Sequence, residues 1–150
     1  EKIDFCINLG ASNGEVRSKD IFSKIKDWAP NGVDIILDPV GGNYFERNLE
    51  VLGIEGNLII IGLMGGAKTE LNLGLLMIKR QKIIGSTIRA RDEKTKNAVM
   101  TELSNKLIPH LEVGEIKPII HQSLPFEDCL EAHRIMESDE NIGKLILEFD

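Results

Sequence analysis

The chain has 150 residues, which allows one domain with its own core or one lobe of a larger fold. Apolar residues make up 42% and charged residues 28%, as in ordinary globular proteins, and the net charge of -6 argues against a nucleic-acid surface. The apolar runs are too short to cross a bilayer, so we expect neither nucleic acid nor membrane as a partner.

Helical and strand patterns alternate along the chain, which predicts the α/β class with right-handed βαβ units. The strands read as continuous apolar runs, as expected of a parallel sheet buried on both faces. In chain order the predicted elements are a helix closed by Gly10, an edge strand 14–17, a helix from a Ser18 cap to Pro30, a strand 33–37, a helix that starts at a capping box of Asn43 and Glu46 and closes at Gly53, a strand 57–61, a helix 73–79, a strand 82–88, a helix 94–107 stopped by Pro109, a strand 118–122, a helix 126–137 and a strand 144–149.

Two cysteines, Cys6 and Cys129, stand far apart, with no Cys-x-x-Cys motif and no histidine nearby at metal-ligand spacing. Unpaired thiols fit a reducing compartment, so we expect a cytoplasmic protein without a metal site. The chain begins with Glu1 rather than Met and opens directly on a helical pattern. From this start we expect a fragment of a longer protein.

Three predicted strands end in unusual turns: Asp-Pro-Val-Gly-Gly at 38–42, Gly-Leu-Met-Gly-Gly at 62–66 and Ser-Thr-Ile-Arg at 86–89. Ligands of parallel sheets bind beyond the carboxyl ends of the strands, so these turns predict a ligand site. Their glycines and peptide groups could approach an amide or a ribose, or the turns could need glycine for their own geometry. Asp38 could accept a ligand hydroxyl, but a bond to the backbone of its own turn is favoured.

Charged residues and histidines carry weaker signals. Lys2 and Arg17, the latter at the end of the predicted edge strand, could each reach a phosphate or simply be solvated. His110, His121 and His133 have no serine or cysteine partner at a recognisable spacing, so we interpret all three as structural.

The chain closely resembles the zeta-crystallin-like quinone oxidoreductases, in the zinc-free branch of the medium-chain dehydrogenase/reductase superfamily. The motifs that carry the resemblance are VDIILDPVGGNYFERNL, IGLMGGAK, GSTIRARD, EAHRIMES and NIGKLILEF. The resemblance covers the C-terminal half of such an enzyme. It implies a Rossmann-type doubly wound parallel sheet over residues 1–90, without its first strand and glycine-rich phosphate loop. Residues 91–150 would be a linking helix and the C-terminal return segment of a GroES-like catalytic domain.

The resemblance also implies roles for individual residues in binding NADPH. Those matched to the nicotinamide contacts are Ile61, Gly62, Leu63, Met64, Thr87, Ile88 and Arg89. Pro39, Gly41 and Gly42 would lie beside the nicotinamide ribose. Lys2 would contact the 2′-phosphate of NADPH. Arg17 stands at the position where members of the family often have a tyrosine that assists this lysine. Asp139 stands where relatives offer an arginine or asparagine, and Asn141 is the expected substitute.

For the intact protein the family implies hydride transfer from NADPH to a quinone or related α,β-unsaturated carbonyl. It further implies no metal, and a homodimer through the strand 82–88. We expect the isolated chain to bind NADPH poorly and to lack reductase activity. A non-catalytic NADPH-binding or lens-structural protein would share these residues. A Rossmann methyltransferase would share the Asp-Pro strand end but would not account for GLMGG or GSTIRARD.

Overall fold

The computed structural model describes residues 1–149 and divides the chain into two compact units. The first covers Ile3–Arg91 and the second starts at Asp92. The first unit holds α1 (Lys2–Asn8), α2 (Ile21–Trp28), β1 (Val33–Asp38), α3 (Gly42–Val51), β2 (Leu52–Ile60), α4 (Leu73–Lys79) and β3 (Lys82–Gly85). The second holds α5 (Glu93–Lys106), α6 (Ile108–Glu112), β4 (Ile120–Pro125), the 3-10 turn η1 (Phe126–Asp128), α7 (Cys129–Glu137) and β5 (Lys144–Glu148).

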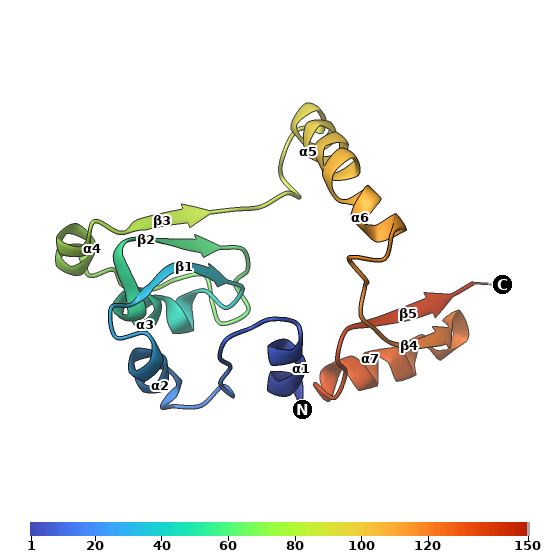
Figure 1. The fold of residues 1–150 in the computed structure, drawn as a ribbon, viewed down its shortest axis with the longest axis horizontal. Helices are drawn as coiled ribbons and strands as arrows, with labels where there is room; N and C mark the ends of the chain where they lie inside the picture. The colour runs from blue at the N-terminus through green and yellow to red at the C-terminus, as the bar shows by residue number, and fades with distance from the viewer. Residues whose placement is uncertain (150) are drawn as a thin grey trace. The chain divides into compact units, whose positions relative to one another are not determined.

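The first unit is built on a three-stranded parallel sheet in the order β1-β2-β3. The three arrows run the same way in Figure 1, so their carboxyl ends share one edge. One face carries the core, in which Phe45 and Leu49 of α3 pack on Leu52 and Leu58 of β2. The predicted α/β class with parallel strands is confirmed.

The opposite face of this sheet is not covered by the described residues. Leu37, Ile59 and Ile84 form one row across the three strands. Leu37 is 61% exposed and Ile84 is 42% exposed, and Ile35 on the same face of β1 is 63% exposed. The prediction of burial on both faces is therefore wrong for this chain, because α3 and α4 both pack on the other side.

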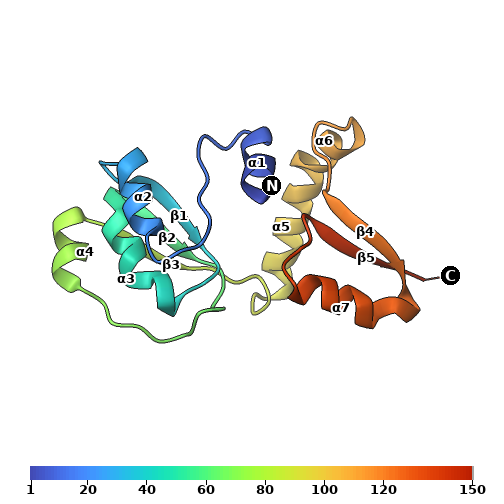
Figure 2. The ribbon, with the colours of Figure 1, turned by 90° about the horizontal axis from the view of Figure 1, so that it is seen from below.

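The second unit pairs β4 and β5 in parallel, with α7 against one face (Figure 2). Leu124, Ala132 and Ile135 form its small core, supported by Leu145 and Leu147.

Several strands differ from the predicted bounds, because pairing with residues distant in the sequence determines where a strand forms and ends. Residues 14–17 form no strand, since a strand requires a ladder partner and none of the described strands pairs with this segment. The predicted strand 82–88 ends at Gly85, after which only the Ser86 N–H still bonds to β2, at Ile60 O.

The predicted starts of two helices, α2 and α3, are also wrong. The Ser18 side chain does not cap α2, which begins at Ile21. The predicted capping box of Asn43 and Glu46 does not form either, because α3 already begins at Gly42, following Gly41. By contrast, the helix predicted over 73–79 coincides with α4.

Candidate functional site

Two turns interlock at the carboxyl ends of β1 and β2, and we call residues 38–42 and 62–66 the rim loops. The first leads from β1 into α3 and the second follows β2, and backbone hydrogen bonds join the two loops. The backbone bonds between them are Met64 N–H to Pro39 O (3.3 Å), Gly65 N–H to Val40 O (2.7 Å) and Gly42 N–H to Gly66 O (2.8 Å). Just before the second loop, Ile61 N–H also donates to Asp38 O (2.9 Å). Several peptide groups predicted to be available to a ligand are therefore used inside the protein.

Asp38 anchors the first rim loop. Its side chain is 2% exposed and accepts hydrogen bonds from the N–H groups of Val40 at 2.7 Å and Gly41 at 3.1 Å. The Asn48 side-chain amide of α3 donates a third, at 3.0 Å. The interpretation that Asp38 bonds its own turn is confirmed, and its oxygens are occupied by protein donors.

Glycine is required where the rim loops touch. Gly41 has φ +78°, and a Cβ there would lie 2.9 Å from the Gly66 carbonyl oxygen. A Cβ on Gly62 would lie 2.6 Å from the Pro39 carbonyl oxygen. Real Cβ atoms do not approach that closely, so for these two positions the turn itself accounts for glycine.

A pocket of about 460 Å³ opens between the ends of β2 and β3. It is lined by Ile60, Ile61, Gly62, Leu63, Gly85, Ser86 and Thr87. Within residues 1–149 the peptide N–H groups of Gly62 and Leu63 donate to no backbone acceptor. The lining is mainly aliphatic, with two hydroxyl groups and no charged side chain, so the pocket suits a flat, uncharged ring that carries hydrogen-bonding groups.

A second hollow, of about 280 Å³, includes Met64 and Gly65 of the same rim loop. Arg17 also lines it, with its guanidinium carbon 6.0 Å from the ring centre of Tyr44. Phe22 meets that ring edge-on, with 5.3 Å between ring centres. A guanidinium held near an aromatic ring suits an anionic or aromatic group.

The remaining predicted site residues lie in different places. Thr87 lines the first pocket, whereas Ile88 and Arg89 follow it along the chain and do not. Lys2 is the first residue of α1, and Asn141 donates from its side-chain amide to the Gly143 carbonyl at 2.9 Å. Ser86 was placed in the predicted turn 86–89 but was given no role in cofactor binding, and it lines the same pocket as Thr87.

Lys79 is another residue that the sequence did not single out. Its ammonium donates to the carbonyls of Glu50 and Leu52, both at 2.8 Å, at the C-terminal end of α3. Burial lowers the pKa of Lys79, and the positive charge of Lys26 lowers it further. The contacts satisfy carbonyls at a helix end, so Lys79 has a structural role.

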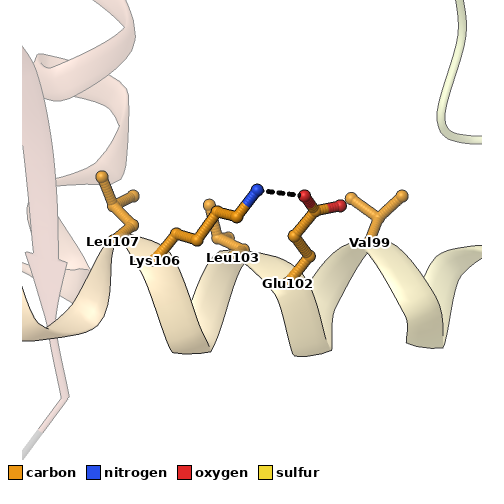
Figure 3. Close-up of a pocket in the computed structure, with 5 residues that line it drawn as sticks. All are labelled: Val99, Glu102, Leu103, Lys106 and Leu107. Carbon is orange, nitrogen blue, oxygen red and sulfur yellow. Dashed lines mark hydrogen bonds and ion pairs between the residues drawn. The ribbon is translucent and has the colours of Figure 1, made fainter.

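A hollow of about 340 Å³ on α5 has few groups that could bind or react with a ligand. Val99, Leu103 and Leu107 project from the same side of the helix as an ion pair of Glu102 with Lys106 at 2.6 Å (Figure 3). The ion pair is exposed, and the other side chains are aliphatic.

In the part of the chain that the structure describes, no group of three or more His, Cys, Asp or Glu side chains is arranged to hold a metal ion. No described helix is long and apolar enough to span a membrane.

Comparison with known families assigns the chain. The family model described as "Zinc-binding dehydrogenase" matches residues 10–147. The chain belongs to this family. It is 31% identical over 140 residues to Quinone oxidoreductase 1 of Escherichia coli (strain K12), a match that covers 87% of this chain and 41% of that protein. The resemblance predicted from the motifs is confirmed.

Other known proteins match over similar lengths. The "Synaptic vesicle membrane protein VAT-1 homolog" of Rattus norvegicus is 30% identical over 154 residues, covering 89% of this chain and 36% of that protein. The crystal structure of CurA from Vibrio vulnificus, in complex with NADPH, has the same fold, with a TM-score of 0.76 at 20% identity over 99% of this chain and 47% of that one. The chain thus spans about two fifths of the length of these curated relatives.

Proposed function

We propose that the first unit forms the nicotinamide side of the cofactor site in an NADPH-dependent quinone oxidoreductase. The reaction is hydride transfer to a quinone or a related α,β-unsaturated carbonyl. One observation carries the proposal: the pocket between β2 and β3 places Gly62 and Leu63, whose peptide N–H groups have no backbone acceptor in the described residues, beside the hydroxyl-bearing Ser86 and Thr87. The likeness to the Escherichia coli quinone oxidoreductase supports it.

The residues present fit a nicotinamide ring. Its carboxamide needs both donors and acceptors, which peptide groups and hydroxyls at Gly62, Leu63, Ser86 and Thr87 supply. Its ring needs an apolar slot, which Ile60 and Ile61 line. Because the rim loops hold each other through backbone bonds, these groups are fixed before a ligand arrives.

In this proposal the bound NADPH supplies the hydride, and the chain supplies placement. Gly62 and Leu63 orient the carboxamide and so set which ring face meets the substrate. Aliphatic walls keep water from the ring during transfer. NADPH is preferred over NADH because the Arg17 hollow offers a guanidinium to a phosphate, with Lys2 as a second candidate. The proposal also retains the cofactor contacts that the resemblance implies for Ile88, Arg89 and Asn141.

The 150-residue chain alone should bind NADPH weakly and turn over no quinone. Its described residues contain no glycine-rich phosphate loop, and one face of its sheet is open, with Leu37 61% exposed. Much of the binding energy of a dinucleotide comes from its pyrophosphate. We place the protein in the cytoplasm, and we propose that it works without zinc.

We further propose that two copies pair through β3, which is an edge of its sheet. Pairing satisfies the open N–H and carbonyl groups of an edge strand. The Ser86 N–H bonds to Ile60 O of β2, so by alternation along the strand the N–H groups of Ile83 and Gly85 face the open edge. Gly85→Pro removes one donor from that edge, so light scattering should show a dimer in the unchanged chain and a monomer in the variant. A dimer that survives the substitution would contradict this interface.

The nicotinamide site is tested by NMR titration of the ¹⁵N-labelled chain with reduced nicotinamide mononucleotide, which tolerates weak binding. We expect concentration-dependent shifts of the Gly62, Leu63, Ser86 and Thr87 amides, with Gly114 of the second unit as an internal reference. Shifts that avoid the pocket would refute the assignment.

Turnover requires a second experiment. We would replace the matching segment of the Escherichia coli quinone oxidoreductase with this chain and follow NADPH oxidation with several quinones. Turnover by the hybrid supports an enzyme, whereas a folded hybrid that binds NADPH but reduces no quinone supports the non-catalytic alternative.

A further inference from the structure

Three side chains with nitrogen or sulfur donors share one face of α7. Cys129, His133 and Met136 stand at positions i, i+4 and i+7, which an α-helix places on the same side. All three line a single pocket of about 140 Å³ in the second unit. Sequence reasoning interpreted Cys129 as an isolated thiol and His133 as structural, and overlooked the four-residue interval that joins them.

The rest of the pocket wall is aliphatic. Ala132, Leu145 and Leu147 complete the lining, and all three also belong to the core of the second unit or pack against it. The donor side chains are therefore mounted on a helix that packs against β5 beside the pocket. A site on a packed helix keeps its ligand spacing better than a site on a loop.

His133 differs from the other two histidines in its contacts. His110 Nδ1 lies 2.5 Å from a Glu115 carboxylate oxygen, and His121 Nδ1 accepts from the Ile142 N–H at 3.4 Å. Within residues 1–149, the His133 ring makes no comparable hydrogen bond, and its side chain is exposed beside the pocket. Cys129 is a free, half-buried cysteine.

We propose that Cys129, His133 and Met136 form a binding site for Cu(I). Thiolate and thioether sulfur are soft ligands that select Cu(I), and imidazole also suits copper. Two ligands one helical turn apart can chelate one metal ion, as the paired histidines of H-E-x-x-H helices do. The aliphatic wall offers no oxygen donor, so magnesium and calcium are disfavoured.

Zinc is the main competitor, and the donor set argues against it. A structural zinc site takes four ligands from cysteine, histidine and carboxylate side chains. Only Cys129 and His133 of the pocket belong to those types, and the third donor is the Met136 thioether. On binding Cu(I), the Cys129 S–H bond breaks, a sulfur–copper bond forms, and the proton passes to the buffer.

The test is an anaerobic titration of Cu(I) into the 150-residue chain in competition with bicinchoninate, whose Cu(I) complex is coloured. Parallel titrations use Ag(I), a redox-inert analogue, and Zn²⁺. We expect one tight equivalent of Cu(I) and of Ag(I), and weaker binding of Zn²⁺. Cys129→Ser should reduce the Cu(I) affinity by at least about tenfold, equivalent to about 1.4 kcal/mol.

Two further variants and one matched control separate this site from a bare thiol. His133→Gln and Met136→Leu alter exposed side chains, so they should leave the fold intact, and each should weaken Cu(I) binding by about threefold or more. Cys6→Ser removes the other cysteine, which is exposed in the first unit, and should leave the affinity unchanged. Circular dichroism checks that Cys129→Ser remains folded.

Two results would overturn the proposal. One is loss of Cu(I) binding in Cys6→Ser with retention in Cys129→Ser. The other is unchanged affinity in both His133→Gln and Met136→Leu, which would mean that a thiol alone binds the metal. On addition of Ag(I), the ring protons of His133 should shift in the NMR spectrum while those of His110 and His121 stay in place.

Discussion

Replacing Asp38 by alanine tests whether one buried carboxylate holds the rim loops in place. The carboxylate accepts from Val40 N–H at 2.7 Å, Gly41 N–H at 3.1 Å and the Asn48 amide at 3.0 Å. Alanine provides no acceptor, and because Asp38 is only 2% exposed, bulk water has little access to the donors in its place. All three donors then lose their partner at once.

The expected cost follows from how far water can reach each donor. Gly41 and Asn48 are buried, whereas Val40 is half-buried. An unpaired buried donor costs about 1–3 kcal/mol, so we assign about 1.5 kcal/mol to each of the two buried donors and about 1 kcal/mol to Val40 N–H. The substitution should therefore destabilise the first unit by about 4 kcal/mol, near the upper end for a single substitution.

Urea unfolding followed by circular dichroism measures this loss. Asp34→Ala is the matched control, because Asp34 is an exposed aspartate of the same strand, and it should change stability by less than about 0.5 kcal/mol. Any folded fraction of Asp38→Ala should also lose the NMR shifts that reduced nicotinamide mononucleotide produces at Gly62 and Leu63. A loss of stability no larger than that of the control would refute the anchoring role of Asp38.

Three other substitutions probe separate parts of the first unit and the start of the second. Gly62→Val should abolish the response to reduced nicotinamide mononucleotide in the same NMR titration, because its Cβ would lie 2.6 Å from a backbone carbonyl oxygen, whereas Gly74→Ala in α4 should bind normally. Since folding lowers the pKa of Lys79 from 10.5, the unfolded chain binds more protons in the alkaline range below 10.5, so stability should rise with pH there. Lys79→Met should flatten that rise in thermal unfolding measured at several pH values, and an identical slope would contradict the assignment. Asp92 caps α5 by accepting from Thr95 N–H at 2.8 Å, and hydrogen bonds from Thr95 lower its pKa below 3.8. The contribution of this cap is present above pH 3.8 and lost as the pH falls through the lowered value, so helix signal should fall in acid. Neither Asp92→Ala nor Asp92→Asn has a carboxylate at this position, so neither variant should show this fall. At neutral pH only Asp92→Asn should keep the helix start, because asparagine can still cap it.

Local signals were sufficient where neighbouring residues decide the structure. The helix over 73–79 was predicted with its observed bounds, because Asn72 accepts from Leu75 N–H at 3.0 Å and Arg80 ends the helix in a left-handed conformation. The strand before Asp38 was also evident, since its apolar run is bounded by turn residues. The turns that follow β1 and β2 were predicted for the same reason, from their glycine and proline residues.

Other features depended on partners distant in the sequence. Residues 14–17 were predicted as an edge strand, but no described strand pairs with them, so they remain irregular. Asn43 and Glu46 match a capping box, yet the cap of α3 lies two residues earlier, at Gly41, where the rim loops meet. Pairing of residues that are far apart along the chain cannot be read from either segment alone.

The sequence by itself determined the alternation of helices and strands, the family, and the rim as the place to look for a ligand, because composition, periodicity and turn residues are local properties. Only the tertiary structure decided what the glycines do. Gly41 and Gly62 allow two loops to meet at van der Waals distance, and the peptide groups of Gly42 and Gly65 are used between those loops. The N–H groups left over belong to Gly62 and Leu63, and which donors remain depends on a loop packing that no single segment encodes.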